Sequence, residues 1–152
     1  MRVKVALAVL DARIDERCRS IAETHEPWPC TKGCDLCCRS LPHLPTITRA
    51  EWERLVPALT DVQKARLLEP VGPAPVTCPL LENGVCSVYD VRPISCRTYG
   101  FYAERDAGLH CAIVTEHTKD RDVIWGNGEA IAADLRRDGP ERSLADWLRE
   151  TG

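Results

Sequence analysis

The sequence contains the stretch Cys30-Thr31-Lys32-Gly33-Cys34-Asp35-Leu36-Cys37-Cys38, which places four thiols within nine residues. A chain that turns tightly through Gly33 can direct three of these thiols at one centre. Thiolate is the form of cysteine that binds metal, and several thiolates packed together repel one another unless a cation lies among them. The stretch therefore predicts a loop that binds a metal ion or a metal cluster.

The neighbours Cys37 and Cys38 point in different directions in most backbone conformations, so we do not expect both to bind one tetrahedral ion. One of them is then an extra thiol or a ligand of a second site. A second group of thiols, Cys78, Cys86 and Cys96, follows after a long intervening segment. A metal site that closes a long loop restrains the unfolded chain more than a local site does, which favours ligands from both groups.

The composition concentrates the thiols in the proline-rich centre of the chain. The chain has 152 residues, with 9 cysteines and 11 prolines but only one phenylalanine. Seven of the cysteines lie between Cys30 and Cys96, and ten of the prolines lie between Pro27 and Pro93. A chain of this length buries about 70% of its unfolded surface, so we expect one domain over 1–152 whose ends fold without metal.

Charge and hydropathy exclude several classes of protein. The net charge is -3 and charges of both signs are interspersed, so no basic surface is expected to bind nucleic acid. The longest apolar run, Val5–Leu10, is far shorter than the roughly 18–20 residues that cross a bilayer, which argues against a membrane helix. This run also lacks the cleavage site of a secretory signal. We therefore expect a cytoplasmic protein, in which clustered cysteines bind metal more often than they form disulfides.

Apolar spacing and capping residues predict helices towards both ends of the chain. A helix is predicted over Gly128–Arg137, and Ser143 caps a final helix that carries Trp147 and Leu148. Near the start of the chain, one helical stripe is formed by Val3, Leu7, Leu10, Ile14, Cys18 and Ile21.

Two further helices are predicted in the first half of the centre, where Thr48 and Thr60 each begin a capping box. The second of these helices is expected to end at Pro70, and the proline-rich connector 70–75 that follows cannot be helical. The fold class that we expect is mainly α. It is a small single domain with terminal helices around a loop-rich, cysteine-bearing metal-binding centre that also has room for two short strands.

The second half of the centre carries a turn signal at Asn83-Gly84, which predicts a short hairpin with Val85–Tyr89 as its second strand. Pro93 is well placed to begin a short helix that carries Cys96 and Arg97.

The ordered combination of motifs from Cys30 to Phe101 resembles the CxxCxxCC cysteine-cluster family, which is described as zinc- or iron-chelating. The resemblance rests on the run up to Cys38, a cysteine-proline-leucine stretch at Cys78, a glycine before Cys86, and then a tyrosine, arginine-proline and cysteine-arginine. It implies a metal-binding segment over 30–101 with zinc or iron as the partner, and an iron-sulfur cluster as one form of the iron. It implies no particular protein partner. The ligands that the resemblance implies are Cys30, Cys34, Cys37, Cys38, Cys78, Cys86 and Cys96. Three residues separate Cys30 from Cys34, where the family pattern has two.

The cysteine spacing leaves the choice between zinc and iron open. The C-x3-C-x2-C order of Cys30, Cys34 and Cys37 is shared with enzymes that hold three corners of a four-iron cluster, but no βα repeat follows it. Four thiolates also make a closed zinc site, although the two C-x2-C knuckles of a zinc ribbon are absent. This favours an iron-sulfur or irregular zinc site over a ribbon, and soft sulfur donors argue against magnesium or calcium.

The remaining cysteines and histidines have simpler interpretations. Cys18 lies on the apolar stripe of the first helix and is expected to be a core side chain. Cys111 lies in a short apolar stretch, where a buried structural thiol is favoured over an eighth ligand. His25, His43 and His117 have polar or proline-flanked neighbours, and each is expected to face solvent and not to bind metal.

Two arginines flank Cys96, and each has two interpretations. Arg92 and Arg97 could donate hydrogen bonds to a thiolate or a bridging sulfide, or they could pair with carboxylates such as Asp90 or Glu104. For Arg97 we give equal weight to bonding with sulfur and pairing with a carboxylate. For Arg92, the following proline indicates that the arginine-proline pair mainly sets a turn.

We interpret the chain as a metal-binding protein whose physiological role is open. The alternatives are a redox or accessory enzyme that uses an iron-sulfur cluster, a zinc-stapled interaction scaffold, and a disulfide-rich secreted module. The sequence contains no Ser-His-Asp order, glycine-rich phosphate loop or convincing pair of buried carboxylates. We therefore name no catalytic residue and leave open whether the protein is an enzyme.

Overall fold

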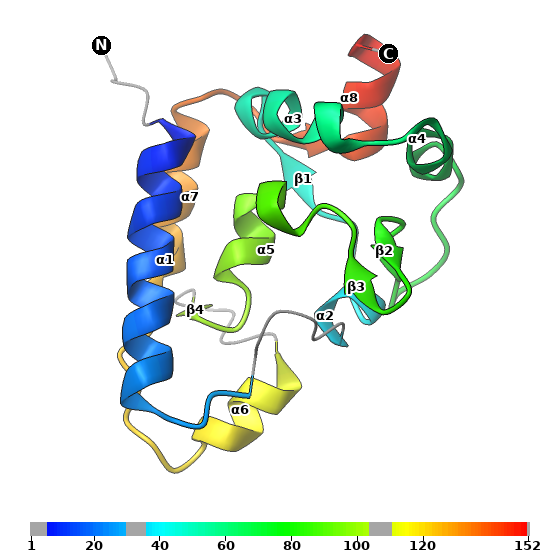
Figure 1. Cartoon of the computed structure of the whole chain (residues 1–152). Coiled ribbons are helices and arrows are strands. Elements are labelled where there is room, and N and C mark those ends of the chain that lie inside the picture. Colours follow the sequence, from blue (N-terminus) through cyan, green and yellow to red (C-terminus); the bar gives the residue numbers. More distant parts are fainter. Residues whose placement is uncertain (1–5, 30–35, 104–110, 152) are drawn as a thin grey trace. The chain divides into compact units, whose positions relative to one another are not determined.

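A computed structural model describes residues 6–29, 36–103 and 111–151 (Figure 1). The architecture is mainly α, as expected, with strands of only two residues each. No helix in these ranges is long and apolar enough to cross a membrane. The chain divides into two compact units, 1–32 with 94–138 and 33–93 with 139–152. The single domain expected over 1–152 stays a prediction.

The first unit is built on the long N-terminal helix. Its elements are α1 (Leu7–Thr24), α5 (Ile94–Thr98), β4 (Tyr102–Ala103), α6 (Ala112–Thr118), β5 (Gly126–Asn127) and α7 (Gly128–Arg136). The predicted stripe of α1 faces inward, with Leu10, Ile14 and Ile21 buried, while Val3 lies outside the described residues. These helices form because each buries an apolar face against the others. The core of the unit consists of Leu10, Ile14, Ile94, Ile131 and Leu135.

A parallel strand pair connects two distant segments of the first unit. Tyr102 of β4 lies opposite Gly126 of β5. A Cβ atom at Gly126 would lie 2.5 Å from carbon atoms of the Tyr102 ring, so a larger residue here would displace that ring. Next to it, the side chain of Asn127 accepts a hydrogen bond from the amide of Ala130 and caps α7. The strand pair therefore fixes where α7 begins.

The second unit consists of short elements from the centre and the C-terminus of the chain. They are α2 (Leu36–Arg39), β1 (Thr46–Ile47), α3 (Arg49–Leu55), the 3-10 helix Val56–Ala58, α4 (Asp61–Leu67), β2 (Leu81–Glu82), β3 (Val85–Cys86), the 3-10 helix Tyr89–Val91, β6 (Arg142–Ser143) and α8 (Leu144–Thr151). Strand β1 pairs with β6 and strand β2 with β3, both antiparallel. The core of this unit, the second-unit core, consists of Ile47, Trp52, Leu55, Leu59, Leu67, Leu80, Val88, Leu144, Trp147 and Leu148.

Both predicted capping boxes are confirmed. Thr48 caps α3 and Thr60 caps α4, and each hydroxyl accepts a hydrogen bond from the amide three residues later. Helix α4 ends at Leu67, earlier than the expected end at Pro70, and the connector 70–75 is not helical. The local signals therefore set where these helices begin more accurately than where they end.

The predicted hairpin is also confirmed, although its strands are shorter than expected. Asn83 and Gly84 have positive φ angles of 52° and 78°, as a type I′ turn requires. The second strand covers only Val85–Cys86, because the chain then enters the 3-10 helix Tyr89–Val91. The expected short helix after Pro93 is α5.

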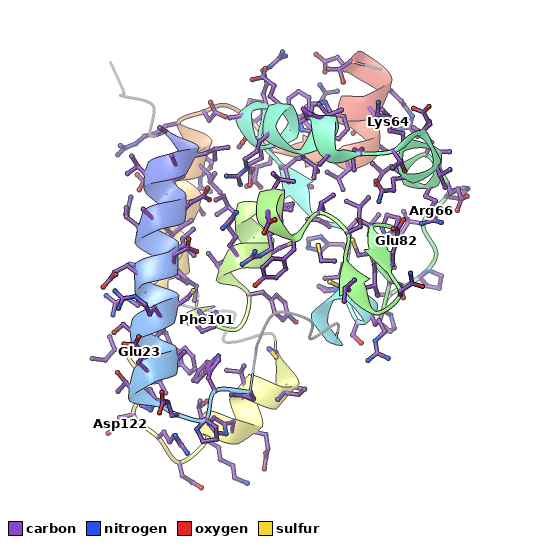
Figure 2. The ribbon with its side chains drawn as sticks, viewed as in Figure 1. Glu23, Lys64, Arg66, Glu82, Phe101 and Asp122 are labelled. Atoms are coloured by element: carbon purple, nitrogen blue, oxygen red, sulfur yellow. The ribbon has the colours of Figure 1, made fainter. Side chains whose placement is uncertain are left out.

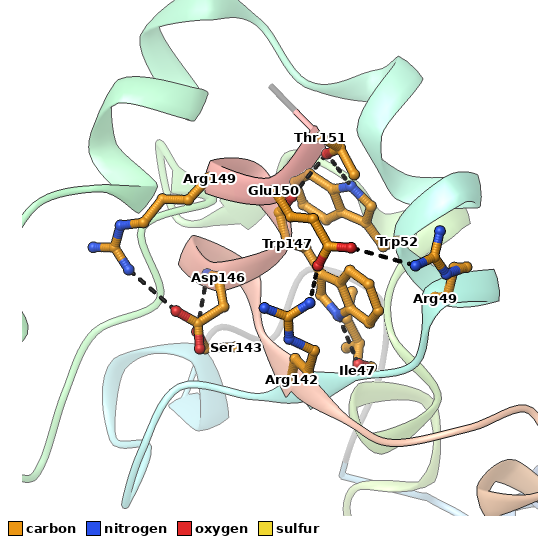
Figure 3. A network of polar contacts seen from close by, with 10 residues as sticks. All are labelled: Ile47, Arg49, Trp52, Arg142, Ser143, Asp146, Trp147, Arg149, Glu150 and Thr151. Carbon is orange, nitrogen blue, oxygen red and sulfur yellow. Dashed lines mark hydrogen bonds and ion pairs between the residues drawn. The ribbon is translucent and has the colours of Figure 1, made fainter.

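Helix α8 closes the second unit through two tryptophans (Figure 3). The indole Nε1 of Trp147 donates to the carbonyl oxygen of Ile47 at 2.8 Å, and that of Trp52 donates to Thr151 Oγ1 at 2.9 Å. Glu150 pairs with Arg49 at 3.4 Å and with Arg142, while Ser143 caps the helix as predicted. Because both indole rings are almost fully buried and hydrogen-bonded, α8 belongs to the core of this unit.

The capping box of α3 predicts a measurable contribution to stability. The carboxylate of Glu51 is 3% exposed and accepts hydrogen bonds from the amide (2.8 Å) and the hydroxyl (3.0 Å) of Thr48. We expect Thr48→Val to lower the free energy of unfolding by about 1–2 kcal/mol, because it removes the cap and a donor to a buried carboxylate. Urea denaturation measures this loss. Exposed Thr77→Val is the matched control, with a change within about 0.5 kcal/mol. Equal free energies of unfolding for the Thr48 and Thr77 variants would show that the capping box does not stabilise the fold.

Candidate metal centre

Backbone hydrogen bonds join the two groups of predicted ligands. The amide of Cys78 donates to the carbonyl oxygen of Cys38 at 2.7 Å. Beside this contact, Leu41 and Val76 exchange amide-to-carbonyl hydrogen bonds of 2.9 and 2.8 Å and form an isolated antiparallel bridge. Cys38 lies near the end of α2, so the end of the first cysteine group and the start of the second lie side by side.

The hairpin places Cys86 close to the same segment. The amide of Leu81 donates to the carbonyl oxygen of Cys78 at 3.1 Å, and Leu81 is the strand partner of Cys86. The side chains of Cys78 and Cys86 are partly buried and pack against the second-unit core. These thiols are therefore fixed by well-packed residues although they belong to loops and a hairpin.

Polar contacts from α4 hold this hairpin in place. Buried Gln63 donates through Nε2 to Glu82 Oε1 at 3.2 Å and to Ser87 Oγ at 3.0 Å. Arg66 pairs with Glu82 at 3.1 Å (Figure 2). The hydroxyl of Ser87 in turn donates to the carbonyl oxygen of Leu80. The position of the Cys86 thiol consequently depends on the packing of α4.

The remaining predicted ligands are only partly described. Cys30 and Cys34 lie outside the described residues, and Cys37 lies on α2. Cys96 lies on α5 of the first unit and is exposed. Within the described ranges, no three His, Cys, Asp or Glu side chains gather closely enough to hold a metal ion. The described thiols nevertheless fit zinc or iron, since partly buried sulfur donors suit these metals and not magnesium or calcium.

The two cysteines interpreted as core residues are confirmed as such. Cys18 packs against the core of the first unit, and its Sγ lies 3.9 Å from the carbonyl oxygen of Arg97. Cys111 is 6% exposed and precedes α6 as its N-cap residue, where its carbonyl oxygen accepts a hydrogen bond from the amide of Thr115. Burial accounts for both side chains without a metal.

The structure gives Arg97 carboxylate partners, which is one of its two predicted interpretations. Its Nε lies 3.2 Å from Asp11 Oδ1 and its Nη1 lies 3.7 Å from Asp15 Oδ1, both on α1. The side chain is only 10% exposed. Arg97 therefore fixes α5, which carries Cys96, to α1 of the same unit.

Arg92 contacts Tyr89 and Arg54 in the second unit. Its guanidinium lies 3.9 Å from the centre of the Tyr89 ring, and Nη1 donates to the carbonyl oxygen of Tyr89 at 2.8 Å. Arg54 Nη2 donates to the carbonyl oxygen of Arg92 at 3.2 Å. These contacts fix the turn before Pro93, in agreement with the structural role expected for the arginine-proline pair.

The expectation that all three histidines face solvent is wrong for His25, which is half-buried, and for His117. His43 is exposed, but His117 is half-buried against the ring of Trp28 at a centroid distance of 6.0 Å. Trp28 also stacks on Phe101 at 5.3 Å and contacts Trp125 at 6.1 Å. The sequence reasoning missed this aromatic cluster because its members come from distant segments and share no local periodicity.

The family comparison agrees with the cysteine geometry. Residues 29–123 match the CxxCxxCC family model, described as "Putative zinc- or iron-chelating domain", and this is more than half of the chain. The chain belongs to the CxxCxxCC family. Searches of curated proteins and of solved structures find no match to this chain. The CxxCxxCC match includes both ligand groups and leaves out Cys18, and it supports metal binding in general.

The burial of Cys111 predicts slow alkylation. Because this thiol is almost inaccessible, iodoacetamide is expected to modify it only as the first unit unfolds, with or without bound metal. Exposed Cys96 in metal-depleted protein is the internal control and reacts first. Peptide mass spectrometry over time measures both rates. Modification of Cys111 as fast as Cys96 in folded protein would contradict the burial.

Proposed function

We propose that the protein binds zinc or iron, with an iron-sulfur cluster as one form of the iron, through thiolates of its two cysteine groups. The observation that carries the proposal is the backbone hydrogen bond from Cys78 to Cys38, which joins the last residue of the first group to the first residue of the second. The family membership supports the same chemistry. The proposed ligands are Cys30, Cys34, Cys37, Cys38, Cys78, Cys86 and Cys96.

Partial burial makes a metal partner favourable for these thiols. Removing a thiolate from water is costly, and a nearby cation offsets that cost. Cys78 and Cys86 pack against apolar side chains, so a bound cation would offset the cost of a thiolate at either position. The well-packed hairpin limits the reorganisation that binding requires.

The metal has a structural consequence for the centre of the chain. The connector 70–75 is exposed and leads directly to Cys78. We infer that bonds from metal to Cys78 and to the first cysteine group hold this proline-rich segment in place, because they close the long loop between the two groups. Such a site would suit a metal-binding module in redox chemistry, sensing, metal handling or the maturation of another protein. A reducing compartment such as the cytoplasm would keep the thiols available.

Elemental analysis and an optical spectrum of protein purified without oxygen test the proposal. Stoichiometric zinc in a colourless protein would assign zinc. Iron with inorganic sulfide and a visible absorption that dithionite bleaches would assign an iron-sulfur cluster. Folded, reduced protein that contains no metal, and in which all 9 thiols titrate after denaturation, would overturn the proposal.

Replacing one ligand should weaken metal binding. We expect Cys78→Ser to lower metal affinity by more than about 100-fold, because even residues that only orient a ligand contribute about 10–100-fold. Competition with a chromophoric chelator measures the affinity. Cys18→Ala is the matched control and should keep the wild-type affinity, since Cys18 packs in the core of the first unit. A folded Cys78→Ser protein with unchanged affinity would remove Cys78 from the ligand set.

A further inference from the structure

A groove of about 460 Å³ lies wholly within the first unit. One wall is a face of α1, where four lining residues follow the helical spacing of i, i+3, i+4 and i+7. The other walls come from β4, β5 and the first turn of α7. The residues that the argument uses are Arg13, Glu16, Arg17, Ser20, Tyr102 and Asn127.

Most polar groups of this groove are hydrogen-bond donors. In the described part of the chain, Arg17 has no carboxylate partner. Arg13 pairs with Asp134 through Nη1 at 2.7 Å, which leaves the other guanidinium N–H groups available. Asn127 uses its Oδ1 to cap α7, so its NH₂ group stays available as a donor. Ser20 and Tyr102 add hydroxyls.

Charged groups of both signs act on Tyr102 in this groove. Burial raises the pKa of Tyr102 above its usual value, Cys18 and Asp15 act in the same direction, and the charges of Arg17 and Arg13 act in the opposite direction. The carboxylate among the lining residues belongs to Glu16, and Arg19 engages it. The N-terminus of α7, a helix of nine residues, adds a partial positive charge.

We propose that this groove binds an oxyanion, a carboxylate or a phosphate, carried by a small molecule. Arg17 forms the ion pair, and Tyr102, Ser20 and Asn127 donate hydrogen bonds to the same group. The groove is the size of a small metabolite site and not of a macromolecular interface. The proposal is independent of the metal centre, because none of the groove residues is a proposed ligand.

The close packing of Gly126 gives the groove a fixed floor. The ring of Tyr102 lies so near the backbone of Gly126 that no side chain fits between them. Tyr102 is therefore held against β5 by the strand pairing, and its hydroxyl has little freedom to move. A preorganised donor of this kind loses less conformational entropy on binding than a mobile surface side chain.

Titration of the full metal-loaded chain with two probes, inorganic phosphate and succinate, tests the proposal by calorimetry and by NMR shifts. We expect one or both probes to bind with a Kd of about 1 mM or lower, and the tighter probe assigns the oxyanion to the phosphate or the carboxylate class. Arg17→Gln should weaken binding at least about tenfold. Arg121→Gln removes the same charge from an exposed position outside the groove and should leave binding unchanged.

A second variant separates the groove from general charge effects. Tyr102→Phe keeps the ring against Gly126 and should weaken binding several-fold while circular dichroism and metal content stay as in the wild type. Absence of binding by both probes up to about 10 mM would overturn the proposal. Equal loss in the Arg17 and Arg121 variants would also overturn it, because binding would then follow net charge and not the groove.

Discussion

The hydrogen bond from the amide of Cys78 to the carbonyl oxygen of Cys38 is the constraint on which the second unit depends. It closes a long excursion of the chain that contains β1, α3, α4 and the connector 70–75. A loop of this length costs conformational entropy to close, and one hydrogen bond does not offset that cost in water. The closure is supported by the bridge between Leu41 and Val76 and by the second-unit core. A metal bound by thiols on both sides of the contact would stabilise the same closure.

The apolar core and a bound metal would stabilise different parts of the second unit. Helix α8 packs against the rest of the second unit through its own Trp147 and through Trp52 of α3. Both indoles are buried and hydrogen-bonded. This packing needs no metal. The connector 70–75, in contrast, is exposed at every residue, and the nearby Cys78 is the point at which a metal would act. The core therefore orients Cys78 and Cys86, and under the proposed function a bound metal would order the loops that carry the thiols.

The sequence predicted features that depend on neighbouring residues. The capping boxes at Thr48 and Thr60 and the turn at Asn83-Gly84 could be read from a few residues, because each rests on local hydrogen bonds or a positive φ. Other features could not be predicted from a few residues. They are the pairing of β4 with β5, the contact of His117 with Trp28, and the ion pair of Arg97 with Asp11. These contacts join distant segments and are selected by packing. In the candidate site, the clustering of cysteines predicted a metal-binding loop and the family resemblance implied the ligands, whereas the hydrogen bond between Cys78 and Cys38 needed the structure.

X-ray absorption spectroscopy of the bound metal in the full, anaerobically purified chain tests the central claim most directly. The proposed thiolate centre predicts a first coordination shell dominated by sulfur, with metal-to-sulfur distances of about 2.3 Å. An iron-sulfur cluster would add iron neighbours beyond the sulfur shell. The Cys78→Ser protein, if it retains metal, should have fewer sulfur neighbours than the wild type. A shell of oxygen or nitrogen atoms alone, at about 2.0–2.2 Å, would contradict the account.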